Sequence, residues 1–478
     1  MMKKKTGIIL VAVLAVFTVS AKRPNVVVVL LDDVSRDDVS VYPSRLAETP
    51  QMERIAQEGV TFETCWSSAM CFPSRALLMT GKYPYQTKIY HNHFRPYPNE
   101  PHYFPHERHV TLPFLFKQAG YKTYVSGKWH MPGNIPNKHT TEVGFDEYCV
   151  HVHNYEQIPK DQEFDGFVEK EPDLWPGRVS VFWHPGLMFN GQMIDTTIDD
   201  YGPDIFNDYA IKFVDQHQDS DQPFFLYYPL YLAHTQPDYM TGAPEQFVPV
   251  PERDENGKWT GKRTPPGQKY EIEYADYLIG RLYDHLEQNG MLENTIFLVT
   301  GDNSSVTTGR KCEPVADGCL VPFFITGPGI EENVRSRALI EFTDIYSTLA
   351  DAVGIDVPDS YKIDGKSFWP VLSGAKEKTR DHILVHFGYD KLVRDEAWYL
   401  DGYDDLYFCG ESRHPSEYQK ATPEMEGAAA ARKRLQAVRD SIPEHDAVED
   451  AHLMERYKRE WSAFLERAAE QQRKRNES

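Results

Sequence analysis

The chain has 478 residues, of which 41% are hydrophobic and 26% are charged, and these proportions exclude a disordered, collagen-like or polytopic membrane protein. With 51 basic and 72 acidic residues the net charge is −21, and a field of that sign disfavours binding to nucleic acids. An anionic substrate would therefore need a local cluster of cations.

The first residues have the pattern of a secretory leader. Lys3, Lys4 and Lys5 precede an apolar run over 7–19, and Val19-Ser20-Ala21 offers small residues for cleavage. The pattern predicts a signal peptide over residues 1–21 and a periplasmic or secreted mature protein. The alternative is a membrane anchor, but a spanning helix needs about 20 apolar residues. No cysteine follows the leader, so we expect no lipid or membrane anchor.

The strand and helix patterns alternate along the chain. Residues 25–31 form an unbroken β-branched run, typical of a strand buried on both faces of a parallel sheet. A helix is predicted next, with Thr49 as its cap, Pro50 in its first turn and Gly59 at its end. The remaining predicted elements are strands over 123–126, 224–232 and 295–300 and a helix over 269–288.

This alternation predicts an α/β fold, with a large, mostly parallel sheet flanked by helices in a catalytic domain over 22–374. A composition shift near residues 374–380 separates this domain from the C-terminal residues. Short strand patterns then precede helix patterns over 428–438 and 448–469. They predict a smaller C-terminal α+β subdomain over 375–478, with a small antiparallel sheet and helices.

Polar residues stand just past the carboxyl ends of the predicted strands. They are Asp32 and Asp33, Lys128 and His130, His234, and Asp302 and Asn303. In open α/β sheets the ligand crevice lies at this edge, so we expect the four groups to converge.

Cys71 begins the stretch Cys-Phe-Pro-Ser-Arg75 and lies where a helix is predicted to start. Pro73 suits the first turn of that helix and Gly81 its end. The exposed N–H groups of a helix start would stabilise a thiolate, an alkoxide or a bound oxyanion, and Arg75 can point to the same place. The alternative is a buried structural cysteine. Six cysteines in all are too few for a disulfide framework, although Cys312 and Cys319 could close a small loop.

Asp32, Asp33, Asp302 and Asn303 offer only hard oxygen ligands. Such a set suits Ca²⁺ or Mg²⁺ and lacks the imidazoles expected of a zinc site. The alternative for an Asp-Asp pair alone is a turn or a helix cap.

Residues 71–81 match the pattern C-x-P-S-R-x-x-x-[LM]-T-G, and the chain resembles the type I, formylglycine-dependent sulfatases of the alkaline-phosphatase-like superfamily. The resemblance extends from Pro24 to about Gly374. Further stretches match the family in the same order: Leu31-Asp32-Asp33, Gly127-Lys128-Trp129-His130, Asn294-Thr295 through Asp302-Asn303, and Asp364-Gly365-x-Ser367. Lys311, which lies 11 residues before Pro322, matches the second active-site lysine of the family.

The resemblance implies that a maturation enzyme oxidises Cys71 to formylglycine, whose hydrated aldehyde is the nucleophile. It also implies one divalent ion, usually Ca²⁺ and less often Mg²⁺, bound by Asp32, Asp33, Asp302, Asn303 and an oxygen of matured Cys71. Arg75, Lys128 and Lys311 would form the positive centre that holds the sulfate. His130 would orient or deprotonate the nucleophile, and His234 would protonate the leaving alcohol.

Three departures from the family pattern affect these assignments. His234-Thr-Gln-Pro237 replaces the usual H-x-P, and Ser304 stands where glycine is common after the asparagine. Ala316-Asp317-Gly318 replaces Glu-Gly-Gly, so Asp317 is given no role.

The leaving group is suggested only by two histidine-rich insertions, over residues 91–109 and 151–190. We expect them to shape a subsite for a sulfated carbohydrate, a polysaccharide or an oligosaccharide; the alternative is a structural lid. The sequence leaves two other functions open. One is hydrolysis of phosphonate or phosphate esters on the same scaffold. The other is non-catalytic binding of sulfated glycans by a chain whose Cys71 is never matured.

Overall fold

The structure, a computed structural model, describes residues 22–43, 45–92, 109–131, 140–168, 177–238, 243–443 and 462. The predicted signal peptide lies outside these residues, and so does the predicted helix over 448–469 except for Ser462. Within the described ranges, no helix is long and apolar enough to cross a membrane.

Parallel strands form the centre of an 11-stranded sheet, as predicted. Strand β1 (Asn25–Leu31) lies between β12 (Thr295–Gly301) and β7 (Phe224–Pro229). Next to β7 come β3 (Lys122–Gly127) and β4 (Glu147–His151), both parallel to it. Every residue of β1, β7 and β12 is buried, which explains why their sequences are mostly apolar.

The two edges of the sheet contain strands that the sequence patterns did not predict. Beyond β12 the order is β14, β2 and β13, all antiparallel to their neighbours, and β15 pairs with β2 in parallel. Beyond β4, the strands β5 and β6 are antiparallel. The bounds are β2 (Gly59–Trp66), β5 (Leu187–Phe189), β6 (Gln192–Met193), β13 (Leu320–Val321), β14 (Phe323–Thr326) and β15 (Val334–Glu341).

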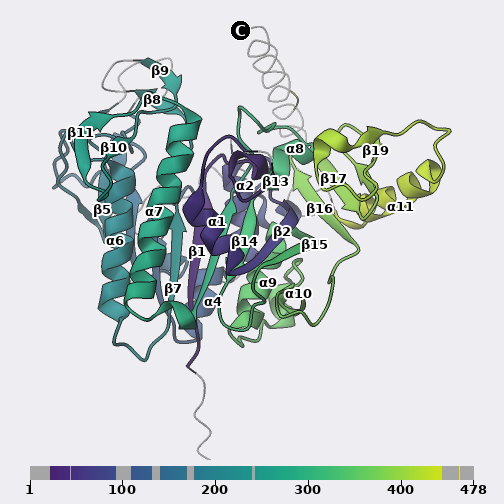
Figure 1. The fold of residues 1–478 in the computed structure, drawn as a ribbon, viewed down its shortest axis with the longest axis horizontal. Helices are drawn as coiled ribbons and strands as arrows, with labels where there is room; N and C mark the ends of the chain where they lie inside the picture. The colour runs from purple at the N-terminus through teal and green to yellow at the C-terminus, as the bar shows by residue number, and fades with distance from the viewer. Residues whose placement is uncertain are drawn as a thin grey trace, which may run out of the picture.

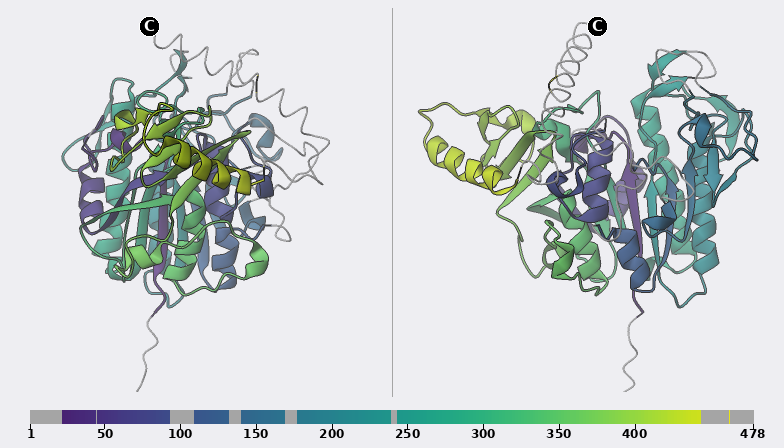
Figure 2. Two further views of the ribbon diagram at one scale, coloured as in Figure 1. Left: turned by 90° about the vertical axis from the view of Figure 1, so that its right-hand side faces the viewer. Right: turned by 180° about the vertical axis from the view of Figure 1, so that it is seen from behind.

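Helices cover both faces of the sheet, as predicted (Figures 1 and 2). Val27 and Val29 of β1 belong to the buried cluster on one face, and Val26 and Val28 to the cluster on the other. The first face packs against α1 (Pro50–Gln57), α6 (Gly202–His217) and α7 (Gln268–Gln288). The second packs against α2 (Cys71–Thr80), α4 (Leu112–Gln118), α9 (Phe342–Ala352) and α10 (Trp369–Leu372).

Short elements complete this part of the chain. The small hairpins are β8 (Gln236–Asp238) with β9 (Ala243–Gln246) and β10 (Pro251–Arg253) with β11 (Trp259–Arg263). The short helices are α3 (Pro84–Thr87), α8 (Ala316–Cys319) and the 3-10 turns η1 (Arg36–Asp38), η2 (Tyr155–Gln157), η3 (Leu292–Asn294) and η4 (Asp359–Tyr361).

A second, five-stranded antiparallel sheet lies C-terminally, as predicted. One face packs against Trp66 and Leu339 of the main sheet, and the other packs against Ala431 and Leu435 of α11. The boundary near residue 374 stays a prediction, because the buried clusters continue across both sheets. The C-terminal elements are β16 (His382–Phe387), β17 (Asp390–Asp395), β18 (Trp398–Leu400), β19 (Leu406–Phe408), η5 (Pro415–Glu417), β20 (Gln419–Lys420) and α11 (Ala428–Ser441).

Two local predictions need correction. Cys319 is a free, buried thiol, so the predicted loop closed by Cys312 and Cys319 is wrong. Gly59 does not end the helix: α1 stops at Gln57, and Gly59 is the first residue of β2, where its backbone packs directly against that of Ile325.

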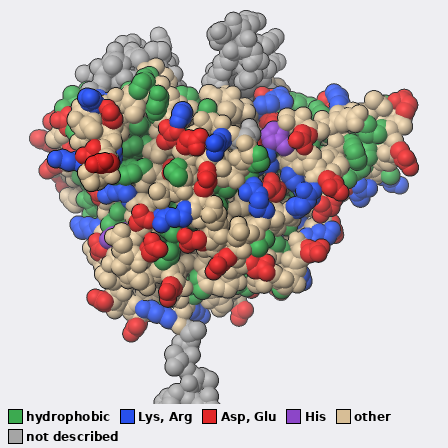
Figure 3. Space-filling view, viewed as in Figure 1, with side chains coloured by type: hydrophobic (Ala, Val, Ile, Leu, Met, Phe, Trp, Pro, Cys, Tyr) green, Lys and Arg blue, Asp and Glu red, His purple; other side chains and the backbone are tan. Residues whose placement is uncertain are grey.

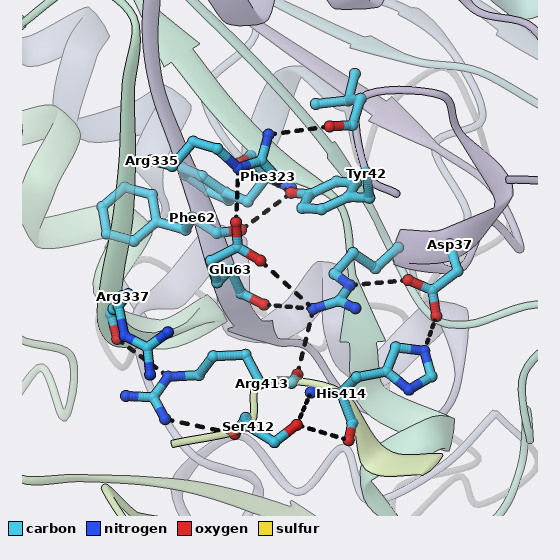
Figure 4. Close-up of polar contacts among 12 residues, drawn as sticks. Asp37, Tyr42, Phe62, Glu63, Phe323, Arg335, Arg337, Ser412, Arg413 and His414 are labelled. Atoms are coloured by element: carbon cyan, nitrogen blue, oxygen red, sulfur yellow. Dashed lines mark hydrogen bonds and ion pairs between the residues drawn. The ribbon is translucent and has the colours of Figure 1, made fainter. Parts of the chain in front are cut away.

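Polar contacts join the main sheet to the C-terminal segment. Arg36 donates hydrogen bonds to the carbonyl oxygens of Glu63 (2.9 Å) and Arg413 (3.2 Å), and His414 contacts Asp37 (Figure 4). Basic side chains gather over this junction on the face seen in Figure 3. The loop that follows β1 is therefore held by the C-terminal part of the chain.

The His414–Asp37 contact should make stability depend on pH. The hydrogen bond to Asp37 raises the pKa of His414 above its ordinary value of 6.5. Burial alone would raise the pKa of Asp37, but the bond to His414 and the charge of Arg36 outweigh burial and hold it below 3.8. The contribution of His414 to the free energy of unfolding is complete below about pH 6.5 and is lost as pH rises through the raised pKa of His414. The aspartate contribution is complete above about pH 4 and is lost as pH falls through the lowered pKa.

We therefore expect His414→Ala to reduce the free energy of unfolding more at about pH 5.5 than at about pH 8.5. Chemical denaturation of the wild type, His414→Ala, Asp37→Asn and the double variant would isolate the pairwise contribution. A coupling energy that is the same at both pH values would contradict the assigned protonation states.

Candidate active site

Cys71 is the first residue of α2, two residues before Pro73, so the helix starts slightly earlier than predicted. The loop before it is fixed by Ser74, whose hydroxyl accepts from the Ser68 N–H (3.0 Å) and donates to the Ser68 carbonyl (3.1 Å). Gly81 ends the helix with φ 63, a left-handed conformation that favours glycine. The predicted helix is confirmed, and it places Cys71 at its amino end.

The ends of β1 and β12 bring three carboxyl groups to Cys71. The Cys71 sulfur lies 3.6 Å from Asp32 Oδ1 and 3.8 Å from Asp33 Oδ1. Asp302 accepts a hydrogen bond from the Asp33 N–H at 3.2 Å, and Asn303 donates one to Asp33 Oδ1 at 2.8 Å. The predicted convergence of these strand ends is therefore observed.

Lys128 joins this group from the end of β3. Gly127 has φ 130, and a Cβ there would lie 1.9 Å from the Pro229 carbonyl oxygen, so only glycine permits this close approach to β7. The Lys128 N–H then donates to the same carbonyl at 2.7 Å. Its ammonium group contacts Asp32 and lies 3.8 Å from the Cys71 sulfur.

Arg75 pairs with a carboxylate of the site, and its predicted contact with the sulfate stays a prediction. The side chain is wholly buried, and its Nε and Nη2 both donate to Asp302 Oδ2, at 3.0 and 2.7 Å. Its Nη1 donates to the Lys128 carbonyl oxygen at 2.6 Å. Arg75 thus links α2 to the ends of β12 and β3, and in this geometry it acts as a positioning residue.

Lys311 reaches the site from the loop after β12, and its ammonium lies 2.5 Å from Asp33 Oδ2. Buried polar groups hold this loop against the residues after β1. The Ser305 N–H donates to Ser35 Oγ at 2.9 Å, and Asp38 accepts from the Ser35 N–H at 2.8 Å and from the Thr308 hydroxyl. Asp38 therefore fixes the position of Lys311 relative to Asp33 without touching either side chain.

The two predicted histidines differ in placement. His234 Nε2 lies 4.0 Å from Asp33 Oδ2, and its Nδ1 lies 2.6 Å from the Thr235 carbonyl oxygen. Because a carbonyl can only accept, Nδ1 carries a proton, and Nε2 carries one only in the imidazolium form. His130 has φ 38 and an exposed side chain, and its ring centroid lies 6.2 Å from that of Phe72. No hydrogen bond joins His130 to the other site residues that the structure describes.

Burial and neighbouring charges shift the pKa values of these groups in opposite directions. Burial raises the pKa of Asp32 to about 7; Lys128 opposes this, and Asp302 and Asp33 reinforce it. Burial would also raise the pKa of Asp33, but the charges of Lys311, His234 and Lys128 together outweigh it and hold the pKa well below the ordinary range. Burial and Lys128 lower the pKa of His234, so its imidazole is neutral at pH 7 before an anion binds.

The carboxyl groups have the geometry of a cation site. One ligand atom each from Asp32, Asp33, Cys71 and Asp302 lie within 4.8 Å of one another. Asn303 Oδ1 is buried and has no hydrogen-bond partner, as expected of an oxygen that binds a metal ion. The residues therefore fit a hard divalent cation bound by Asp32, Asp33, Asp302 and Asn303.

Near Lys128 the structure places Tyr231, which sequence reasoning did not single out, and His151, which was predicted only as part of the second insertion. The Tyr231 ring lies 5.4 Å from Lys128 Nζ, and its hydroxyl lies 3.1 Å from His151 Nδ1. Tyr231 follows β7, one strand from β3, and His151 ends β4. Their positions past or at strand ends were the available signal, but an isolated tyrosine or histidine does not reveal its partner.

The insertions are described in part. In the first, His91 and His109 are buried, and residues 93–108 lie outside the described ranges. In the second, His151 and Trp183 are buried, and the Trp183 indole donates to the Pro249 carbonyl at 2.8 Å. Burial and this hydrogen bond are typical of a side chain that packs in the protein interior. The predicted sugar subsite stays a prediction.

Known proteins that resemble this chain include several sulfatases. A family model described as Sulfatase matches residues 24–355. The N-acetylgalactosamine-6-sulfatase of Canis lupus familiaris is 26% identical over 403 residues, which cover 77% of this chain and 69% of that protein. The N-acetylgalactosamine-6-O-sulfatase of Bacteroides thetaiotaomicron is 24% identical over 493 residues, which cover 88% and 92% of the two chains. The crystal structure of Ps i-CgsB in complex with k-i-k-neocarrahexaose has a TM-score of 0.67 and 21% identity, and the match covers 88% of this chain and 92% of that one.

We expect Ca²⁺ to stabilise the protein through the Asn303 oxygen and the three carboxylates. At about 100 times its Kd, a ligand that binds only the folded state adds about 2.7 kcal/mol to the free energy of unfolding. Thermal unfolding of chelator-treated protein with added Ca²⁺ should show this stabilisation in the wild type and a much weaker one in Asn303→Ala. Asp317→Asn, which alters a carboxyl group near Arg310, is the control and should respond like the wild type. Equal stabilisation of Asn303→Ala and wild type would contradict the ligand set.

Proposed function

This chain belongs to the sulfatase family, within the alkaline-phosphatase-like superfamily, and from that premise we propose that it removes sulfate from a sulfated carbohydrate at the site around Cys71. The single observation that carries the proposal is the contact of Cys71 with Asp32, Asp33 and Lys128 at the carboxyl edge of the sheet. This contact brings Cys71, at the start of a helix, next to an ammonium group that can bind a sulfate oxygen and two carboxyl groups that can bind a cation.

A carbohydrate substrate is supported by what the relatives are named for. The canine and Bacteroides sulfatases are named for N-acetylgalactosamine 6-sulfate chemistry, and the solved Ps i-CgsB complex contains a neocarrahexaose. We extend this to a sulfated polysaccharide or oligosaccharide for the present chain. The sugar ring and the position of the sulfate are left open.

Maturation of Cys71 to formylglycine is part of the proposal. The motif over residues 71–81 supports it, as does the place of Cys71 at the start of α2. The hydrated aldehyde supplies a nucleophilic oxygen and can release sulfate by re-forming the aldehyde, which a plain thiol or hydroxyl cannot do. A divalent cation, proposed to be Ca²⁺, would lower the pKa of a hydroxyl group of the hydrated aldehyde and hold a sulfate oxygen.

Lys128 and Lys311 are proposed to bind the sulfate oxygens. Both lysine side chains are at most 9% exposed, and their ammonium groups pair with Asp32 and Asp33 respectively. At an effective dielectric constant of 20, one unit pair at about 4 Å is worth about 4 kcal/mol before desolvation. Two fixed ammonium groups therefore stabilise the charge that develops on the sulfate as the ester bond breaks.

His234 is proposed to protonate the leaving sugar oxygen from Nε2. Its Nδ1 hydrogen bond to Thr235 orients the ring, and Asp33 lies on the Nε2 side. The negative charge of a bound sulfate would favour the imidazolium form that this step needs. His130, which follows β3 and has an exposed side chain, is proposed to orient the nucleophile.

Export is also proposed. The basic residues, the apolar run over 7–19 and the Val19-Ser20-Ala21 site support removal of residues 1–21 and a periplasmic or secreted enzyme. Export fits a substrate that is a large external polysaccharide.

Mass spectrometry of the purified enzyme tests maturation and export together. We expect a mature amino terminus at Lys22 and an aldehyde in place of the thiol in the peptide that contains Cys71. Sulfate release from sulfated saccharides should accompany the aldehyde. An active enzyme whose Cys71 is an unmodified thiol would contradict the proposed nucleophile.

Lys128→Ala and Lys311→Ala should each lower kcat/KM for sulfate release by about 10² or more, because each removes a cation from the proposed sulfate site. Lys122→Ala is the matched control, because Lys122 begins the same strand that Lys128 follows and pairs with Glu147 at 2.9 Å. The control should stay within about twofold of wild type. Near-wild-type turnover in both site variants would discredit the assigned pocket.

His234→Ala should slow hydrolysis most for sulfate esters with poor leaving groups. We expect a loss of about 10² to 10⁴ in kcat for a sugar sulfate and a much smaller loss for an aryl sulfate with an acidic phenol. His217→Ala is the control, since His217 Nδ1 also bonds a backbone carbonyl, at 2.8 Å, but lies at the end of α6. Equal losses on both esters would rule out the general-acid role.

A further inference from the structure

Arg178 is a cationic side chain beside the site that the proposed mechanism leaves unused. It is partly buried, and its Nε is buried without a hydrogen-bond partner. No ion pair joins it to a carboxylate in the part of the chain that the structure describes. A guanidinium without a carboxylate partner among the described residues has N–H donors that can bind an anionic ligand.

The other cations of the site differ in this respect. Arg75 is paired with Asp302, Lys128 with Asp32, and Lys311 with Asp33. Three cations are thus already committed to the carboxylates that surround Cys71. Among the described residues, Arg178 is a guanidinium that no carboxylate pairs with and that can bind an anion.

Backbone hydrogen bonds fix the segment that carries Arg178. The Tyr155 N–H donates to the Gly177 carbonyl at 2.7 Å, and the Val179 N–H donates to the His153 carbonyl at 3.0 Å. Arg178 itself forms an antiparallel bridge with Asn154. The guanidinium therefore projects from a braced segment, whose geometry is set before a ligand arrives.

A chain of side-chain contacts joins this segment to Lys128. His151 Nε2 lies 2.9 Å from the Val179 carbonyl, which can only accept, so Nε2 carries the proton. His151 Nδ1 then accepts from the Tyr231 hydroxyl at 3.1 Å, and the Tyr231 ring lies 5.4 Å from Lys128 Nζ. The residue next to Arg178 is thereby tied to the sulfate-binding lysine.

The charge of Arg178 acts on His234, the proposed proton donor to the leaving group. Burial and the lysines lower the pKa of His234, and the charge of Arg178 adds to this effect. The same charge acts on Tyr231 and His151. Because His234 is the proposed donor to the sugar oxygen, a cation within its electrostatic range lies near the sugar that leaves.

We propose that Arg178 binds a second anionic group of the substrate, a carboxylate or a further sulfate on the saccharide beyond the scissile ester. The substrates of the enzyme are then polyanionic saccharides that carry at least two negative groups. The inference rests on the proposed function and narrows its substrate class. A guanidinium suits either group, since its planar N–H donors match two oxygens of a carboxylate or a sulfate.

The test compares three saccharides that carry the same scissile sulfate: one otherwise neutral, one with a uronate carboxylate, and one with a second sulfate. Wild type should favour at least one dianionic saccharide by about tenfold or more in kcat/KM. Arg178→Gln should lose about 10-fold to 100-fold on that substrate, chiefly through KM, and stay within about twofold on the neutral one. Arg178→Lys, which keeps the charge but not the paired donors, should fall between them.

Arg434→Gln is the matched control for the loss of one positive charge. Arg434 is 54% exposed on α11 and pairs with Asp395, so all three saccharides should keep near-wild-type kcat/KM. Whichever dianionic substrate loses rate in Arg178→Gln identifies the second group as carboxylate or sulfate.

Several outcomes would overturn the inference. Equal kcat/KM of wild type on all three saccharides would do so, even if Arg178→Gln did not fold. Equal loss in Arg178→Gln on neutral and dianionic substrates would assign Arg178 a purely structural role. In both cases sulfate release by the wild type would leave the proposed function standing. A wild type with matured Cys71 that releases sulfate from none of these saccharides, nor from others, would refute the proposed function itself.

Discussion

Mutual compensation of buried charges at one edge of the sheet is the constraint on which the site depends. Asp32, Asp33 and Asp302 are all buried within a few ångströms of Cys71. Each is met by a cation from a different element: Lys128 after β3, Lys311 in the loop after β12, and Arg75 on α2. Burial of any one of these carboxylates without its partner would be strongly unfavourable. The ion pairs therefore help to fix the positions of the strands, the loop and the helix that carry them. The three carboxylates and the three cations balance one another, so a bound sulfate ester would leave a net negative charge that a divalent cation can offset.

A second layer of polar contacts makes this arrangement rigid. Arg75 holds Asp302 and, through a backbone carbonyl, the position of Lys128. Asp38 links the turn after β1 to the loop that carries Lys311. The C-terminal segment closes over the same turn through Arg36 and Asp37. Groups that stabilise developing charge work best when they need not move during the reaction, and this layer supplies that preorganisation.

The sequence predicts the central strands and their polar ends because both signals are local. The runs in β1, β7 and β12 are mostly apolar, and Asp32 and Asp302 follow β1 and β12 directly. The edge strands gave no such signal: β15 includes the exposed Arg335 and Arg337, and β14 has only four residues. The support given by Asp38 to Thr308, or by Tyr231 to His151, joins residues that are far apart in the chain. Such pairs have no periodicity to detect, so they become visible only when the sheet places them side by side.

This organisation separates the part of the site that cannot vary from the part that can. The strand ends around Cys71 are tied to the charge balance, and a shift of β1, β3 or β12 would unpair a buried charge. The segment that carries Arg178 lies beside β4 and β5, at the edge of the sheet farthest from β2. Side chains there can change without disturbing the carboxylates. His151 bridges the two regions, since it ends β4, bonds the Val179 carbonyl and touches Tyr231 beside Lys128. We therefore expect the edge segment to recognise the sugar and the strand ends to bind the sulfate.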